Sequence, residues 1–232
     1  TLISSLAVTI IPSISEQSNN IDSGNVKDIN VLKSKINFSI RTTIVFSSLL
    51  MPMFIALGEP ICKLVFKNEV AGHYLSIATI AMIPMGISQI TSSMLNAIGL
   101  ELKSLKNYVI SASLLIFSIL FLPKYIGTYS LIVGHFLMSL SSSILNIKML
   151  AKRNLIDFSF IKTMLIMLLT ILISSLLGFF VFNLLSKYFI FALFFSSTLT
   201  LISVFFLIYI FNIADFKMVI MRNKDILKHK SS

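Results

Sequence analysis

The chain has 232 residues, of which 56% are hydrophobic and 12% are charged, which excludes an ordinary soluble domain and indicates an integral membrane protein. A net charge of +10 would suggest nucleic acid for a soluble domain, but the apolar runs leave no folded basic face, so we expect no nucleic-acid partner. The single cysteine, Cys62, excludes an internal disulfide bond.

Long apolar segments divide the chain, and most approach the roughly 20 helical residues needed to cross a hydrocarbon core. They predict an all-α integral membrane protein with about seven transmembrane helices. The segments cover residues 1–14, 42–57, 74–100, 108–122, 125–147, 163–186 and 188–214. Apart from the first, the fourth is the shortest, and Pro123 follows it. Only residues 186–188 separate the last two, which predicts a tight helical hairpin.

Polar sequence lies between the first two segments and after the last one. Residues 15–40 are expected to form a cytoplasmic linker, within which residues 26–38 are weakly amphipathic and compatible with a helix on the membrane surface. Residues 215–232 separate apolar from basic side chains. This tail is expected to form either a short basic helix on anionic membrane lipids or a solvated extension.

The Lys and Arg positions orient the segments, because cytoplasmic loops collect positive charge. With seven crossings, 15 of the 19 basic residues fall on one side of the membrane and four on the other. A missed or invented segment would scramble this alternation. The linker and the C-terminus are therefore expected in the cytoplasm.

The third segment carries the clearest functional signal. Four polar side chains recur at i, i+3, i+4 and i+7 and therefore share one helical face: Gln89, Ser92, Ser93 and Asn96. An amide in hydrocarbon needs water or a hydrogen-bonding partner. The stripe therefore either lines a polar cavity or bonds neighbouring helices as a packing contact.

The fifth segment repeats this pattern with a titratable member. Its polar side chains also lie on one face: His135, Ser139, Ser142 and Asn146. His135 is the one ionisable group expected at membrane depth, where it either binds protons or substrate or bonds to a helix backbone. Two such stripes predict two helices that share a polar cleft.

Three prolines and one arginine are further candidate functional residues. Pro12, Pro52 and Pro84 fall inside three consecutive crossings, where each removes a backbone hydrogen bond and permits a bend. Such bends suit helices that rock between inward-facing and outward-facing states, although membrane helices also tolerate proline without that role. Arg41, at the cytoplasmic mouth, is a candidate for steering phosphate, with ordinary topology determination as the alternative.

Residues for covalent chemistry are not grouped in this sequence. The nine acidic residues are dispersed among the loops, and no glycine-rich phosphate loop precedes a lysine. The histidines, His73, His135 and His229, are far apart in the topology. We therefore expect no enzyme activity, no catalytic residue, no metal and no cofactor.

Three stretches carry a family resemblance. Residues 6–16 (Leu-Ala-Val-Thr-Ile-Ile-Pro-Ser-Ile-Ser-Glu), followed by a polar linker and Arg41, resemble a helix and loop of polysaccharide exporters in the multidrug/oligosaccharidyl-lipid/polysaccharide superfamily. Residues 58–66 resemble an outward loop of these proteins, and residues 92–99 resemble a later helix and its exit. The sequence is most similar to the stage V sporulation protein B group.

The resemblance implies a domain organisation. The chain would supply crossings eight to fourteen of a fourteen-helix, MATE-like transporter, and its partner would be the N-terminal half of the same protein, which is absent from this chain. Residues 1–150 would form the transporter lobe, residues 151–214 two additional helices, and residues 215–232 the basic tail. The chain departs from the family pattern at Asn96, where a longer Gln is expected, and at Thr128, where Ala is more usual.

The resemblance also implies a function without covalent chemistry. We expect a flippase in the bacterial plasma membrane that moves a polyprenyl-linked oligosaccharide or peptidoglycan precursor by alternating access. The expected product is spore cortex or cell wall. One alternative is a cation-coupled multidrug exporter of the same fold. Another is a membrane scaffold for cell-wall synthesis that transports nothing.

Overall fold

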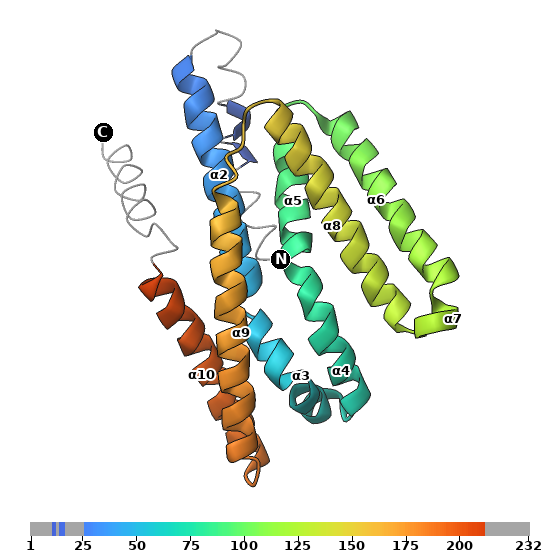
Figure 1. Ribbon diagram of the computed structural model, residues 1–232, viewed down its shortest axis with the longest axis vertical. Helices are drawn as coiled ribbons and strands as arrows, with labels where there is room; N and C mark the ends of the chain where they lie inside the picture. The colour runs from blue at the N-terminus through green and yellow to red at the C-terminus, as the bar shows by residue number, and fades with distance from the viewer. Residues whose placement is uncertain (1–10, 13, 17–25, 212–232) are drawn as a thin grey trace.

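The computed structural model describes residues 11, 12, 14–16 and 26–211. In the first long helix, which begins at Val26, side chains are described from Ile29 onward. The described chain is mostly helical (Figure 1). Its elements are α2 (Val26–Ser48), α3 (Met51–Phe66), α4 (Glu69–Ala78), the 3-10 turn η1 (Thr79–Ala81), α5 (Met82–Ala97), α6 (Glu101–Phe121), α7 (Pro123–Ile126), α8 (Tyr129–Lys152), α9 (Phe160–Leu184) and α10 (Phe189–Ile210).

Six helical stretches of the described chain are long and apolar enough to cross a membrane. They correspond to the second through seventh predicted segments, including the short fourth one, which is the 21-residue helix α6. The predicted first crossing, residues 1–14, lies almost wholly outside the described residues, and so does the predicted basic tail, residues 215–232.

Helix α2 corrects the expected linker, because residues 26–40 are helical and run directly into the second crossing. The apolar side chains Leu32, Ile36, Ile40 and Ile44 repeat every four residues, and each is at most 1% exposed. They pack into a core that includes Ile87 of α5. The weak amphipathic pattern thus marks a helix that buries its apolar stripe against protein rather than against a membrane surface.

Two of the predicted proline bends coincide with breaks in the helices. Helix α2 ends at Ser48 and α3 starts at Met51, with Pro52 in its first turn, and Figure 1 shows two separate helical segments there. The turn η1 separates α4 from α5 just before Pro84, whose ring would clash with the Ile80 carbonyl in a regular α-helix. Pro12 adjoins residue 13, which is outside the described residues.

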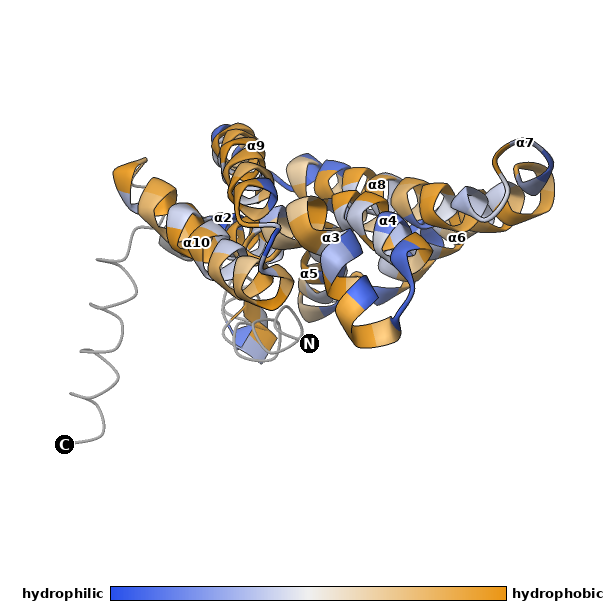
Figure 2. Cartoon of the chain, turned by 90° about the horizontal axis from the view of Figure 1, so that it is seen from below, coloured by the Kyte–Doolittle hydropathy of each residue, from blue (hydrophilic) through white to orange (hydrophobic). Residues whose placement is uncertain are grey.

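The helices form two groups when viewed along the bundle (Figure 2). Helices α9, α10 and α2 lie on one side, and the antiparallel pair α6 and α8, joined by α7, lies on the other.

Between α9 and α10, Gly178 allows close approach, since a Cβ there would come within 2.2 Å of the Thr200 methyl carbon. The predicted tight hairpin of the last two crossings is therefore present.

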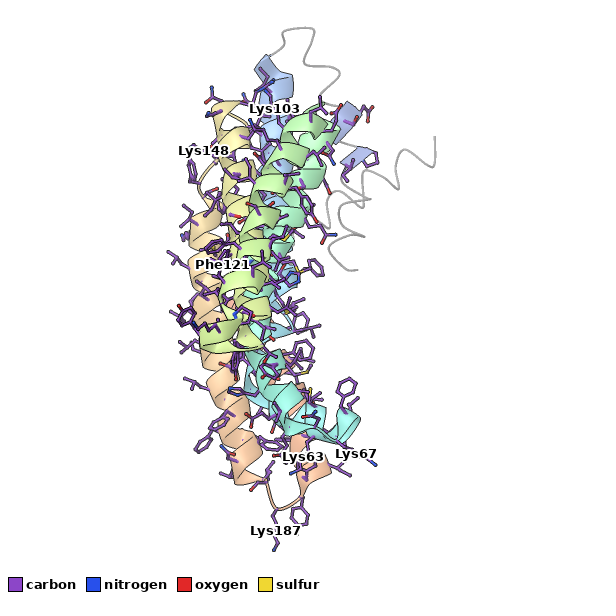
Figure 3. All side chains as sticks on the ribbon, turned by 90° about the vertical axis from the view of Figure 1, so that its right-hand side faces the viewer. Lys63, Lys67, Lys103, Phe121, Lys148 and Lys187 are labelled. Carbon is purple, nitrogen blue, oxygen red and sulfur yellow. The ribbon has the colours of Figure 1, made fainter. Side chains whose placement is uncertain are left out.

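Basic side chains mark the two ends of the bundle. Lys103 and Lys148 lie towards one end in Figure 3, and Lys63, Lys67 and Lys187 lie towards the other. Tyr188 directly follows Lys187 in the sequence, as expected of an aromatic residue at a membrane interface. The two predicted sets of loops are thus on opposite sides, while the assignment of one side to the cytoplasm stays a prediction.

Candidate functional site

A buried asparagine joins three helices. Asn146 of α8 is fully buried, and its side-chain nitrogen donates to the hydroxyl oxygens of Ser92 at 2.8 Å and Thr91 at 3.3 Å, both on α5. Its side-chain oxygen accepts a hydrogen bond from the Asn107 amide of α6 at 3.0 Å. Asn146 therefore satisfies its amide entirely within protein, which is what a carboxamide in a dry interior requires.

A second polar contact lies one helical turn away. The Ser88 hydroxyl of α5 donates to the Ser142 hydroxyl oxygen of α8 at 2.7 Å. Thr91 also donates to the Ile87 carbonyl at 2.6 Å, so its hydroxyl serves its own helix and Asn146 together. We call the group formed by Ser88, Thr91, Ser92, Asn107, Ser142 and Asn146 the polar seam.

Small polar residues extend the polar seam along α6. The buried positions of this helix are Ser104, Asn107, Ser111 and Ser118, while its other faces are almost entirely exposed and apolar. Gly134 of α8 packs opposite this face, where a Cβ would lie 3.0 Å from the Ser118 Cβ. Small side chains let membrane helices approach closely, and this accounts for the tight pairing of α6 with α8.

The predicted stripe of the third segment is divided by the structure. Ser92 belongs to the polar seam, and Ser93 is half-buried. Gln89 and Asn96 are exposed and share a face with the exposed Met85. The packing interpretation thus applies to Ser92, whereas Gln89 and Asn96 remain on the open face of α5.

The predicted stripe of the fifth segment is divided in the same way. Ser139, Ser142 and Asn146 are buried, but His135 is exposed and makes no hydrogen bond or ion pair within the described chain. The two stripes meet through the bonds from Asn146 to Ser92 and from Ser88 to Ser142. The structure does not bring His135 into that contact.

Sequence reasoning missed Asn107 and the buried serines of α6. Their spacing contained a usable signal, because positions 104, 107, 111 and 118 fall at i, i+3, i+7 and i+14 within a largely apolar helix. Ser88 escaped notice because it lies one position before the predicted stripe and points toward α8 rather than along it.

Arg41 belongs to a polar ladder along α2. Lys33 pairs with the Asp157 carboxylate at 2.6 Å, and the Asn37 side-chain oxygen accepts from the Asp157 backbone N–H at 2.9 Å. Arg41 donates to the Ser159 hydroxyl at 2.6 Å, while its Nε is buried without a hydrogen-bond partner in the described chain. Three successive turns of α2 thus hold the loop that leads into α9.

Metal-ligand clusters and known related proteins are two further sources of evidence about function. Among the described residues, no group of three or more His, Cys, Asp or Glu side chains is arranged to hold a metal ion. Comparison with family models, curated proteins and solved structures finds no match for this chain. The functional assignment therefore rests on an all-helical, multi-pass membrane architecture with six candidate spans in its described part and a polar seam between three of them.

Proposed function

We propose that this chain is the C-terminal half of a flippase in the bacterial plasma membrane, which moves a polyprenyl-linked oligosaccharide across the bilayer by alternating access. Its partners are then the lipid-linked sugar, anionic membrane lipids and the N-terminal half of the same protein. A precursor of cell wall or spore cortex is the substrate class that the sequence resemblance favours.

The exposed position of Gln89 carries the proposal. Gln89 lies near the middle of α5, in an apolar stretch long enough to span a membrane. The opposite face of α5 is already occupied, since Ile83, Ile87 and Ile90 are buried in the core. An exposed carboxamide at membrane depth commonly borders a polar path rather than lipid. We therefore assign this face of α5 to the transport path.

Arg41 supplies a second element of this proposal. It makes no ion pair with a carboxylate in the described chain, and its hydrogen bond there goes to the neutral Ser159 hydroxyl. A guanidinium held beside the loop that leads into α9 suits a diphosphate on the lipid carrier. In this role Arg41 anchors the loop and receives the head group.

The test is a flipping assay with the full-length protein in proteoliposomes. A fluorescent polyprenyl-linked oligosaccharide and a small cationic dye are compared side by side. Gln89→Leu is expected to slow flipping about tenfold. The matched control is Ser113→Leu on α6, since Ser113 is also exposed but bonds only its own helix through the Ile110 carbonyl. Transport of the dye alone contradicts the proposal.

His135 favours a second candidate, the cation-coupled exporter of the same fold. It is an exposed, ionisable side chain within the membrane-spanning helix α8. This candidate predicts dye transport that depends on a proton gradient and is lost in His135→Gln. The scaffold alternative predicts that Gln89→Leu and Asn96→Leu leave cell-wall function intact while removal of the tail abolishes it.

A further inference from the structure

Helices α3 and α4 form a hairpin with an interruption of the α-helix at both of its ends. Before α3, Leu49 and Leu50 are bent rather than helical, and after α4 the chain forms the 3-10 turn η1. Pro52 and Pro84 each lie within a few residues of these interruptions. Short irregular stretches at the ends of helices are where backbone dihedral changes concentrate during hinge motion.

Inside this hairpin the two helices are fastened tightly. Gly58 and Gly72 bring the backbones together, since a Cβ on Gly72 would lie 2.4 Å from the Glu59 Cα. The Ser76 hydroxyl donates to the Phe54 carbonyl at 2.9 Å, crossing from α4 to α3. Because these contacts are backbone-to-backbone or directional, the hairpin is expected to move as one body.

The turn of the hairpin is also well defined. Asn68 caps α4 by accepting the Ala71 N–H at 3.1 Å, and Lys63 pairs with Glu69 across the turn at 2.6 Å. Lys67 adopts a left-handed conformation, with φ of 53°, where α3 ends. Figure 3 shows Lys63 and Lys67 near one end of the bundle, so this turn forms the exposed tip.

One polar and aromatic cluster connects the hairpin to the start of α8. The Thr128 hydroxyl donates to the Tyr74 hydroxyl oxygen at 2.5 Å, and the rings of Tyr74 and Tyr129 lie 4.9 Å apart. His73 also meets Tyr129 edge-on, with 6.3 Å between ring centroids. We call Tyr74, Thr128 and Tyr129 the outer latch.

Contact between the hairpin and α9 is of a different kind. It includes a close approach of Ala56 and Gly178, where a Cβ on Gly178 would lie 3.5 Å from the Ala56 Cβ. No hydrogen bond joins α3 to α9 within the described chain. Apolar contacts between membrane helices gain little over contact with lipid, so this side opposes sliding only weakly.

We propose that the α3–α4 hairpin is a gate that turns about the breaks at residues 49–50 and 79–81, and that the outer latch holds it closed against α8. The body against which it closes is fixed, because the polar seam binds α5, α6 and α8 together. A helix of 16 residues is about 24 Å long, so a tilt of about 10° moves the tip by roughly 4 Å. This gate does not depend on which molecule is transported.

Distances between spin labels test the gate in the full-length protein, with Cys62→Ala as background. The reporting pair is Lys67→Cys at the tip and Tyr125→Cys in α7. The reference pair is Lys103→Cys and Lys148→Cys, which belong to the helices of the polar seam. Tyr74→Phe with Thr128→Val is expected to lengthen or broaden the reporting distance by several ångströms and to leave the reference distance unchanged.

A matched control and a hinge variant complete the design. Tyr108→Phe removes an exposed hydroxyl of α6 that makes no hydrogen bond in the described chain, and it is expected to leave both distances unchanged. Pro52→Ala with Pro84→Ala, added to the latch variant, is expected to reduce the broadening by restoring helical continuity. An unaltered reporting distance in the latch variant, or equal changes in both pairs, overturns the gate. Persistent broadening in the proline variant overturns the position of the hinge.

Discussion

The side-chain amide of Asn107 donates to the side-chain oxygen of Asn146 at 3.0 Å, and neither side chain is more than 8% exposed. This bond joins α6 to α8, and the nitrogen of Asn146 carries the connection on to α5. A chain of amides and hydroxyls thus replaces apolar packing at the centre of one helical group.

Replacement of Asn146 should destabilise the protein more than replacement of a surface asparagine. Asn146→Ala removes three hydrogen bonds and leaves the Asn107 amide buried without its acceptor, so we expect a loss of about 1–3 kcal/mol. Thermal unfolding in detergent measures this loss. Asn183→Ala at the exposed end of α9 is the control, and equal effects of both variants would contradict a structural role for the seam.

The coupling between Asn107 and Asn146 is separately measurable. In a double-mutant cycle with Asn107→Ala and Asn146→Ala, the two changes are expected to be non-additive by about 0.5–1.5 kcal/mol, because they remove the same bond. Additive unfolding free energies would show that the bond contributes nothing to stability in the bilayer mimetic.

Glycine substitutions should differ according to what surrounds each position. The Cβ of Gly72→Ala meets the Glu59 backbone at 2.4 Å, which cannot give way, so we expect a loss of about 2–3 kcal/mol. The Cβ of Gly134→Ala meets first the end of the Leu115 side chain at 2.8 Å, and that side chain can rotate. Thermal unfolding should therefore rank Gly72→Ala as the more damaging change, and the reverse order would refute the close backbone crossing.

The ladder on α2 should respond differently to replacement of Lys33 and of Asn37. Lys33 and Asp157 are partly exposed, so Lys33→Gln is expected to change stability by less than about 1 kcal/mol. Asn37 is buried and holds the Asp157 backbone N–H, so Asn37→Ala should expose that amide to solvent. Hydrogen exchange at Asp157 is expected to quicken at least tenfold in Asn37→Ala and to change little in Lys33→Gln.

The open face of α5 is accessible to a direct chemical test. In the full-length protein without Cys62, a water-soluble maleimide is expected to modify Gln89→Cys, because the proposed path contains water. Ile202→Cys on the exposed apolar face of α10 is expected to stay unmodified in lipid. If the two positions react alike, the face of α5 is no more polar than the lipid-facing surface.

The positions of the helices could be predicted from the sequence more accurately than the contacts between their side chains. Hydropathy located α6 despite its short apolar run, because hydropathy is a property of each segment alone. The alternation of basic residues between successive loops also required a crossing there. The division of the α5 stripe could not be foreseen in the same way. Ser92 and Gln89 are both polar and lie on nearby faces, and only the placement of α8 decides that Ser92 is covered while Gln89 is not.

The burial partner of the helix over residues 26–38 was mispredicted for a related reason. Residues 26–38 are polar enough to look like a surface helix. Their four-residue apolar repeat predicts a buried face but does not show which part of the protein covers it. The partner is the core around Ile87, which is supplied by a helix about fifty residues further along the chain and is therefore invisible to local periodicity. The breaks near Pro52 and Pro84 could be predicted, because a proline disturbs the helix close to its own position.

The serines and asparagine on the buried face of α6 have a consequence for biogenesis. As α6 leaves the translocon, Asn107 has no acceptor, because Asn146 is synthesised 39 residues later. An unpaired amide in hydrocarbon is unfavourable, so α6 is expected to stay beside the translocon until α8 emerges. The two helices would then enter the bilayer as a pair, already bonded to each other, and the order of synthesis would itself build the seam.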